Sequence, residues 1–363
     1  MIEEFEEALA AARGLLPTPN AVARLVNRFG VEAAREAFEQ WELRSRARAK
    51  FARAEEMLFV REALEQATHE SVAAYHASLF PVGAPVVDMT AGIGADLIAL
   101  ATRGPTIGYE LDPQRAECAV WNLRAHGLSA PVRVEDSLEA ELGVYAFADP
   151  SRRSGGVRTH DLRQFSPDPF VLAERFGGLK LGVMKLGPGT SDADLERIAP
   201  RIEFVSFGGE CREALAIVGG EPWRGAVRVE TGSRLASGPS AHEDEPLDWL
   251  FDPDPAVVRA GATGTLALQH GLTGLGGYLS GPSKVDSCWL RPYRILWTGR
   301  PDRSDLDKAL RALGGRVFEA KSRADGSEAQ RLMRRLRPQG DRLLSLATWR
   351  TGPRVVAALL ESS

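Results

Sequence analysis

The sequence is poor in cysteine and has no long apolar run, and each shortage excludes a class of protein. Its three cysteines, Cys118, Cys211 and Cys288, are far apart and form no paired motif, which indicates neither a zinc site nor a disulfide framework. No apolar run approaches the roughly 18 residues of a membrane-spanning helix. The acidic start, MIEEFEEALAAA, lacks the positive charge of a signal peptide. We therefore expect a cytoplasmic protein with no membrane partner and no bound metal.

What is present is an ordinary globular composition with an uneven distribution of charge. The 363 residues are 44% hydrophobic and 26% charged, which is typical of two or three folded domains. Residues 1–80 carry a net charge of −3, and residues 81–290 carry −9. Residues 291–363 hold 16 basic and 8 acidic side chains, a net charge of +8. Clustered arginines attract phosphates, although the same charges could form a solvated helix face, and charge alone does not decide between the two.

Residues 1–80 have the pattern of a helical domain. Thr18 is a suitable N-cap, and Leu25 and Phe29 lie on one apolar face at helical spacing. Gly30 is predicted to end that helix.

From residue 85 the pattern changes to short β-rich runs separated by segments of helical period. The runs are PVVDM, PTIGYE, PVRVE, GVYAFAD and KLGVMKL, and the clearest helices are GADLIALATR and PQRAECAVWNLRAHG. This alternation predicts an α/β domain with a doubly wound parallel sheet over residues 81–235. RIEFVSF and EALAIVG follow, and we expect the second to be the last strand of that sheet.

The remainder divides into two segments. Residues 236–290 are rich in Gly, Pro, Asp and Ser and are predicted to be a linker or extension, in which GLTGLGGYLSG is a plain loop. Residues 291–363 are predicted to be a small basic α/β domain. Its strand candidates are YRILW, RVFEA, LLSLATW and VVAALL, and RTGPR is expected to be a hairpin turn. One of its two helices begins with a capping box that pairs Ser327 with Gln330.

The stretch VVDMTAGIGADL predicts a strand, a tight loop and a helix. The loop holds Thr90, Gly92 and Gly94, but Leu97 stands where a dinucleotide-binding loop needs its third glycine. The Gly-Lys-Ser/Thr of a P-loop is also absent. S-adenosylmethionine has no phosphate, and it needs only glycines that let the backbone come close. The loop therefore predicts S-adenosylmethionine binding, with these three residues as contacts.

Three acidic residues support this cofactor. Glu110 ends the second strand, where a carboxylate can accept hydrogen bonds from the ribose hydroxyls, and Asp136 ends the third, within reach of the adenine amino group. Asp88 ends the first strand, beside the methionine moiety. Ligands of open α/β sheets bind at the carboxyl ends of strands, so the three converge. Each acid alone fits a helix N-cap or a solvated loop equally well, but together and in this order they favour a methyltransferase.

These motifs resemble a known family. Residues 85–220 are similar to class I S-adenosylmethionine-dependent methyltransferases, and the whole chain resembles the bacterial methyltransferases with a THUMP-like C-terminal domain. The shared elements are LFVREALEQATHESVAAYHASLF before the sheet, DMTAGIGADL, DPSRR (commonly Asp-Pro-Ala-Arg-Arg), FSPDPF, KLGPG, GGECREA and DPDPAVVRAG. The resemblance implies a Rossmann-like sheet of seven strands with the last antiparallel, between an N-terminal helical domain and a small α/β THUMP-like domain. By analogy it also implies RNA as the substrate class.

The resemblance also assigns roles to DPSRR, at the end of the fourth strand. Amino-methyltransferases place Asp/Asn-Pro-Pro-aromatic here, and the acid and the first proline's carbonyl orient the target NH2. Asp149 and Pro150 are the corresponding candidates, and Ser151 is the third catalytic candidate. Ser151 and Arg152 depart from that pattern, so no aromatic ring for a flipped base is supplied locally. Phe165 is a candidate substitute from the following loop.

The basic residues near this element have two interpretations each. Arg152 and Arg153 are suited to hold the phosphates of a nucleic acid, because guanidinium groups are bidentate and always charged. One of them could instead pair with Asp161 and hold the loop. Lys185, after the fifth strand, either borders the substrate pocket or is solvated.

The sequence therefore predicts an S-adenosylmethionine-dependent methyltransferase that modifies a base nitrogen in RNA, in tRNA or rRNA. A methyltransferase acting on a small molecule or protein is the second hypothesis, and a non-catalytic cofactor-binding protein that interacts with RNA is the third. The cofactor acids and Asp149 favour catalysis, and the +8 charge of the last segment favours RNA. The oligomeric state has no signal in the sequence.

Overall fold

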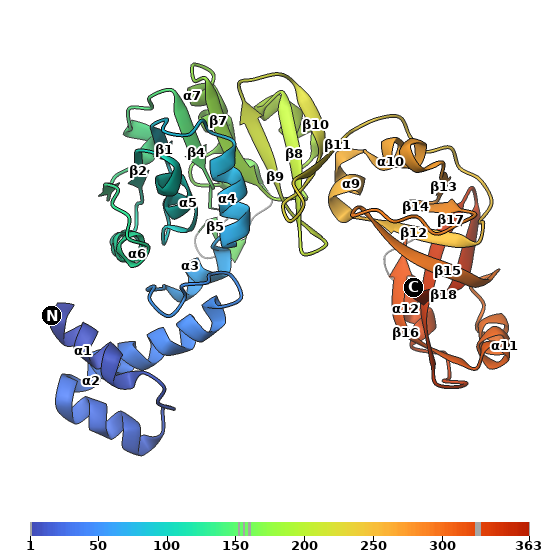
Figure 1. Cartoon of the computed structure of the whole chain (residues 1–363), viewed down its shortest axis with the longest axis horizontal. Helices are drawn as coiled ribbons and strands as arrows, with labels where there is room; N and C mark the ends of the chain where they lie inside the picture. Colours follow the sequence, from blue (N-terminus) through green and yellow to red (C-terminus); the bar gives the residue numbers. More distant parts are fainter. Residues whose placement is uncertain (1, 152, 155–156, 159–160, 324–327, 363) are drawn as a thin grey trace. The chain divides into compact units, whose positions relative to one another are not determined.

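The computed structural model describes residues 2–151, 153–154, 157–158, 161–323 and 328–362 (Figure 1). The chain forms two compact units, each described here by itself. The first comprises Met1–Leu186, Thr190–Arg201 and Ala216–Glu221, and the second Gly187–Gly189, Ile202–Leu215 and Pro222–Ser363. The boundaries of the four segments proposed from the sequence remain a prediction.

Four helices precede the first sheet. They are α1 (Ile2–Ala12), α2 (Pro19–Ala47), α3 (Arg61–Gln66) and α4 (Glu70–Ser78). Thr18 caps α2 as predicted, since its side chain accepts a hydrogen bond from the N–H of Ala21 at 3.3 Å. The prediction that Gly30 ends this helix is only partly right. Gly30 (φ 80°) leaves the helical conformation, but α2 resumes after this kink and runs to Ala47.

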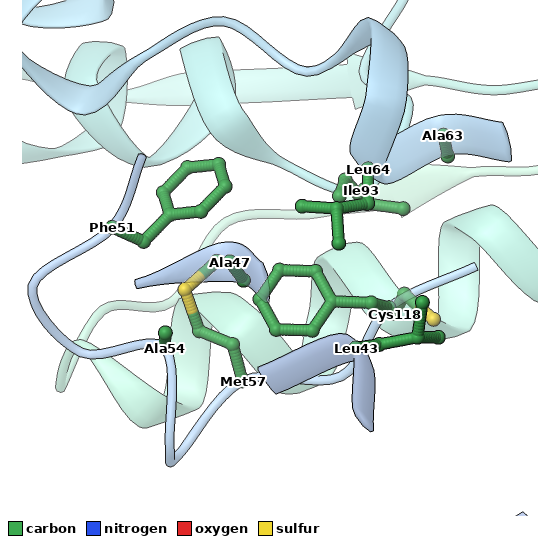
Figure 2. Packing of buried hydrophobic residues seen from close by; sticks show 10 residues of the cluster. Leu43, Ala47, Phe51, Ala54, Met57, Ala63, Leu64, Ile93 and Cys118 are labelled. Carbon is green, nitrogen blue, oxygen red and sulfur yellow. The ribbon is translucent and has the colours of Figure 1, made fainter. Parts of the chain in front are cut away.

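A buried cluster joins this helical region to the first sheet and its helices (Figure 2). The C-terminal part of α2 and the segment after it contribute Leu43, Phe51, Met57, Phe59 and Leu64, among others. Ile93 from the loop after β1 (Val86–Asp88) and Cys118 from α6 (Pro113–Ala125) complete the cluster. Apolar burial at about 25 cal/mol per Å² is the main stabilising contribution of such clusters. The N-terminal helices therefore support the loop that the sequence assigns to the cofactor.

The first sheet has nine strands in the order β11-β10-β8-β9-β7-β4-β1-β2-β3. The elements of this region are β1 (Val86–Asp88), α5 (Ala95–Arg103), β2 (Thr106–Tyr109), α6 (Pro113–Ala125), β3 (Val132–Arg133), η1 (Ser137–Glu139), β4 (Tyr145–Ala148), β5 (Arg153–Ser154), β6 (Val157–Arg158), η2 (Leu162–Gln164), α7 (Pro169–Phe176), β7 (Leu181–Leu186), α8 (Asp192–Ile198), β8 (Arg201–Phe207), β9 (Glu210–Val218), β10 (Trp223–Arg228) and β11 (Ser233–Ala236). The prediction of seven strands was wrong, because β10 and β11 extend the sheet on the outer side of β8. The EALAIVG run of β9 is therefore not the last strand of the sheet.

The pairing of the central strands fixes where the site lies. β1 pairs in parallel with β2 and β4, and β4 pairs in parallel with β7. Asp88 is in register with Gly108 and Phe147, so the ends of β1, β2 and β4 meet at one edge. Helix α4 lies beside α5 on this part of the sheet (Figure 1).

The second unit contains a seven-stranded sheet in the order β13-β14-β12-β15-β18-β17-β16. Its elements are β12 (Trp249–Pro253), α9 (Pro255–Ala260), α10 (Thr263–His270), β13 (Thr273–Leu275), β14 (Tyr278–Gly281), β15 (Leu290–Gly299), α11 (Arg303–Leu313), β16 (Gly315–Ser322), α12 (Glu328–Met333), β17 (Arg342–Thr351) and β18 (Arg354–Ser362). Residues 236–290, expected to be a linker or extension, thus supply three of the seven strands.

Two turn predictions in this unit had opposite outcomes. RTGPR forms the predicted hairpin turn, since Thr351 pairs with Arg354 across Gly352 (φ 55°). GLTGLGGYLSG is not a plain loop, because β13 and β14 pair antiparallel around Gly276 and Gly277, which both have positive φ. Two such residues are typical of a tight hairpin turn. The predicted Ser327 capping box lies outside the described residues. Among the described residues, every helix is too short or too polar to cross a membrane.

Candidate active site

The loop between β1 and α5 depends on two glycines. Gly92 (φ 54°) and Gly94 (φ 92°) adopt the left-handed backbone conformation that favours glycine. A Cβ added to Gly94 would also lie 3.2 Å from the Cα of Ala119 in α6. Glycine at position 94 therefore allows both the tight turn and the close packing of α5 on α6 without strain.

Glu110, just after β2, holds this loop. Its Oε2 accepts a hydrogen bond from the N–H of Gly92 at 2.8 Å, and its Oε1 accepts one from the N–H of Asp112 at 3.0 Å. Each carboxylate oxygen can accept a second hydrogen bond. The fold thus brings Glu110 to the glycine loop, where the sequence predicts its contact with the ribose.

Asp88 is fully buried at the end of β1. Its Oδ1 accepts a hydrogen bond from the N–H of Thr90 at 3.1 Å. Its Oδ2 is buried and has no hydrogen-bond partner in the part of the chain that the structure describes. Burial raises the pKa of Asp88 well above its usual value, and the nearby carboxyl groups of Asp96, Asp149 and Glu110 raise it further. Oδ2 can therefore accept a hydrogen bond from a donor or interact with a cation.

Asp136 occupies a different setting. It is exposed and caps η1, accepting a hydrogen bond from the N–H of Leu138 at 2.9 Å. This is the N-cap role that the sequence allowed as an alternative. The predicted contact with adenine stays a prediction.

Asp149 follows β4 and is tied to the glycine loop. Its N–H donates to Thr90 Oγ1 at 2.6 Å, and its side chain is 30% exposed. Pro150 is buried, and the backbone of Ser151 pairs with that of Ser166 in both directions, at 2.8 and 3.1 Å. These bonds fix the backbone on both sides of Asp149, next to the predicted methyl donor.

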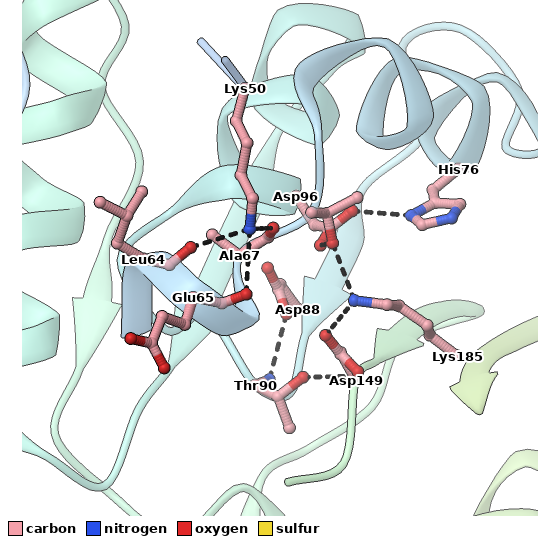
Figure 3. Close-up of polar contacts among 11 residues, drawn as sticks. Lys50, Leu64, Glu65, Ala67, His76, Asp88, Thr90, Asp96, Asp149 and Lys185 are labelled. Carbon is pink, nitrogen blue, oxygen red and sulfur yellow. Dashed lines mark hydrogen bonds and ion pairs between the residues drawn. The ribbon is translucent and has the colours of Figure 1, made fainter. Parts of the chain in front are cut away.

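The Lys185 side chain of β7 reaches the carboxylate of Asp149 (Figure 3). Its Nζ is 2.5 Å from Asp149 Oδ2 and donates to Thr68 Oγ1 at 3.0 Å, and its side chain is only 11% exposed. The interpretation of Lys185 as a solvated lysine was therefore wrong. Its predicted contact with substrate remains a prediction.

Three buried residues next to Lys185 were missed by the sequence reasoning. Asp96 of α5 accepts hydrogen bonds from Thr68 Oγ1 and His76 Nδ1, each at 2.7 Å. Burial acts to raise the pKa of Asp96, but His76, Lys185 and Thr68 outweigh it and lower that pKa. A signal was available, because Thr68 and His76 lie in the ATHESVAAYH part of a motif that resembles the family.

The basic element after Asp149 is only partly described. Arg152 lies outside the described residues, and Arg153 is described only by its backbone in β5. The phosphate clamp and its alternative, a pairing with Asp161, both stay predictions. Asp161 caps η2 through the N–H of Arg163 at 3.0 Å. Phe165, suggested as a stacking ring, is 7% exposed and offers little surface to a base.

Two relatives decide the family. They are uncharacterized S-adenosylmethionine-dependent methyltransferases of Mycobacterium tuberculosis, from strains CDC 1551 / Oshkosh and H37Rv. Each is 34% identical to this chain over 312 residues, which cover 81% of this chain and 85% of the relative. This chain belongs to the S-adenosylmethionine-dependent methyltransferases.

A solved structure supports the same fold for the methyltransferase. The crystal structure of a candidate methyltransferase from Porphyromonas gingivalis W83 aligns with a TM-score of 0.78 and covers 100% of this chain and 98% of its own. The two are 20% identical, so this likeness shows the fold alone. No family model matches the chain.

The residues present fit the cofactor of this methyltransferase. S-adenosylmethionine supplies a methyl group on a sulfonium and also carries an ammonium group. The buried Oδ2 of Asp88, which has no partner among the described residues, is suited to a cationic or hydrogen-bond-donating group. Gly92 and Gly94 remove side chains from the loop, and Glu110 holds the loop in place. Asp88, Thr90, Gly92, Gly94 and Glu110 are thus the residues that we expect to hold S-adenosylmethionine.

Proposed function

We propose that this methyltransferase transfers the methyl group of S-adenosylmethionine to a base nitrogen in RNA, in tRNA or rRNA. The observation that carries the proposal is the position of Asp149. Its backbone is tied to Thr90 of the cofactor loop at 2.6 Å, while its side chain remains 30% exposed. A carboxylate held there can accept a hydrogen bond from a target amino group and turn the nitrogen lone pair toward the methyl group.

Positioning of this kind can supply much of the rate of an in-line displacement, because the nucleophile and the methyl group are aligned before reaction. The carbonyl of Pro150 is proposed as the second acceptor. The backbone pairing of Ser151 with Ser166 keeps that peptide in place. The sulfonium leaves as a neutral thioether when its bond to the methyl carbon breaks. The methylated nitrogen takes up the positive charge and then loses its proton to water.

RNA is proposed as the substrate on the basis of charge. Residues 291–363 carry a net charge of +8 on a chain whose overall charge is −4. A basic segment in an otherwise acidic chain favours a polyanionic partner. A small molecule or a protein is the alternative substrate, and no particular observation on the structure favours it.

The test is transfer of a labelled methyl group from S-adenosylmethionine to separated tRNA and rRNA fractions, followed by nucleoside analysis. We expect Asp149→Ala to lower kcat by about 100-fold or more while the affinity for the cofactor, measured by calorimetry, stays the same. Asp194→Ala removes a carboxylate at the start of α8 and serves as the control with wild-type activity. Incorporation into no RNA fraction, with the cofactor still bound, would refute RNA as the substrate.

A further inference from the structure

Behind the proposed acceptor site lies a continuous chain of polar groups (Figure 3). It runs from Asp149 through Lys185, Thr68 and Asp96 to His76, with successive contacts of 2.5, 3.0, 2.7 and 2.7 Å. Its members come from the β4 end, β7, the α3–α4 loop, α5 and α4. Five separate segments of the first unit therefore meet in one network.

The chemistry of the groups fixes the direction of the hydrogen bonds. The Lys185 ammonium has only donors, so the Oγ1 of Thr68 must accept from it. The single hydroxyl group of Thr68 then donates its hydrogen bond to Asp96, because an ionised carboxylate can only accept. His76 Nδ1 donates to the other oxygen of Asp96, and its ring lies 5.3 Å from that of Phe147 at an interplanar angle of 27°. The direction of each hydrogen bond from Lys185 to His76 is therefore fixed.

Exposure decreases along the chain from the substrate side inward. The Asp149 side chain is 30% exposed and that of Lys185 is 11% exposed, whereas Thr68, Asp96 and His76 are all buried. Buried charges are stable only when they are paired and hydrogen-bonded. Lys185 lies between the carboxylates of Asp149 and Asp96. His76, Lys185 and Thr68 lower the pKa of Asp96 although burial acts to raise it, so the Asp96 carboxylate stays ionised. Thr68 and Asp96 thus hold the Lys185 ammonium in its place beside Asp149.

We infer that Lys185, held by Thr68 and Asp96, is a positioning residue that keeps the Asp149 carboxylate ionised and oriented toward the target amine. The inference rests on the function proposed above, and it gives Lys185 a task other than direct contact with substrate. It also gives the segment around α3 and α4 a part in the active site. An ionised carboxylate has about four acceptor positions, so contact with Lys185 leaves acceptor capacity for the amine.

The charged groups around Asp149 set the expected pH dependence. Among the described residues, the Lys185 ammonium contacts Asp149 directly, and Asp149, Asp96 and Glu110 all act on the carboxyl group of Asp88. His76 of α4 acts in turn on Asp96 of α5. The ammonium in contact with Asp149 favours its ionised form, whereas a nearby carboxylate favours the protonated form. Removal of an adjacent positive charge raises the pKa of a carboxyl group by about 1 to 3 pH units. Without Lys185, Asp149 will therefore take up its proton at higher pH.

The experiment compares Lys185→Met, Lys185→Arg and the control Lys180→Met, which removes an exposed lysine just before the same strand. We expect the acid limb of the kcat–pH profile of Lys185→Met to move up by about 1 pH unit or more. We expect kcat to fall about 100-fold, with KM for the RNA and its salt dependence unchanged. Lys185→Arg keeps the charge and should restore the acid limb, and Lys180→Met should match wild type.

A second pair of variants covers the case in which Lys185→Met does not fold. Thr68→Val removes the hydroxyl at nearly constant volume, and Thr68→Ser retains it. Thr68→Val should shift the acid limb in the same direction by a smaller amount, and Thr68→Ser should not. A direct readout that needs no substrate is the titration of Asp149 in 13Cγ-aspartate-labelled protein, assigned with Asp149→Asn.

The outcomes separate this inference from the proposed function. An acid limb and an Asp149 titration that stay in place in both Lys185→Met and Thr68→Val would overturn the inference. So would a loss confined to KM and to the salt dependence, which would make Lys185 a substrate contact. If Asp149→Ala itself leaves methyl transfer intact, the proposed role of Asp149 fails, whatever the titration of Asp149 shows.

Discussion

Among single residues, Asp88 connects stability with cofactor binding most directly. It is fully buried, one of its oxygens has no partner among the described residues, and burial raises its pKa. A carboxyl group whose pKa is higher in the folded than in the unfolded state binds more protons when folded. Its contribution to stability therefore falls as the pH rises above the unfolded value, which is about 3.9. At neutral pH the ionised form of Asp88 is unfavourable unless a cation or donor approaches it.

We predict that Asp88→Asn raises the melting temperature of the cofactor-free protein at neutral pH, because the amide carries no charge to bury. The same change should weaken S-adenosylmethionine binding by about 10-fold or more, the loss expected for one charge-assisted hydrogen bond. Scanning calorimetry and titration calorimetry measure the two effects. Asp136→Asn is the control for stability, since Asp136 is exposed and Asn caps helices equally well. A lower melting temperature, or an unchanged affinity, would contradict this account.

At the scale of elements, the β1–α5 connection shows why the loop sequence matters beyond its glycines. The loop is held by Glu110 and packed against the N-terminal helices through Ile93. Gly94 both starts α5 and allows its close approach to Ala119 of α6. Loop conformation and helix packing are therefore coupled at one position.

We predict that Gly94→Ala destabilises the protein by about 1–2 kcal/mol, the cost of placing a Cβ in a left-handed conformation. Because the loop must shift to relieve Ala119, binding of S-adenosylmethionine should weaken as well. Gly143→Ala is the matched control, since a Cβ there would meet nothing within 4 Å and its φ is not in the left-handed region. Denaturant unfolding gives the stability, and equal effects of the two variants would show that the loop tolerates the shift.

At the scale of the whole molecule, the distribution of charge is the feature that bears on the partner. Arg334 and Arg335 after α12 are exposed, and they belong to the segment with a net charge of +8. Each phosphate contact that is made contributes a slope of about −0.7 to the dependence of log K on log salt for single-stranded nucleic acid.

We predict that RNA binding weakens steeply with added salt, and that the double variant Arg334→Ala, Arg335→Ala reduces the salt slope by about 1.4, which is about 0.7 for each arginine. The measurement is a binding titration with tRNA at several salt concentrations. The double variant Arg24→Ala, Arg35→Ala removes two exposed arginines of α2, in the acidic N-terminal segment, and should leave the slope unchanged. A slope near zero in the wild type would favour a small-molecule substrate.

Local patterns were sufficient to predict much of the fold and part of the site. The strands β1 to β4 and β7 to β9 and the helices α5 and α6 were expected within a few residues, because apolar periodicity and caps such as Thr18 act locally. The hairpin at Gly276–Gly277 and the strands β10 and β11 were missed. Glycine-rich and short polar strands carry little periodic signal, and only their pairing partners stabilise them.

The sequence by itself determined the glycine loop, the order of the acids at the strand ends and the DPSRR element, since these depend on residue type and spacing along the chain. Only the tertiary structure decided that Lys185 is buried against Asp149 and that Thr68, Asp96 and His76 stand behind it. These groups are up to 117 positions apart in the chain, as for Lys185 and Thr68. Hydrogen bonds and charge pairing act over a few ångströms in space, and no pattern along the sequence encodes which distant segments the fold will bring to that distance.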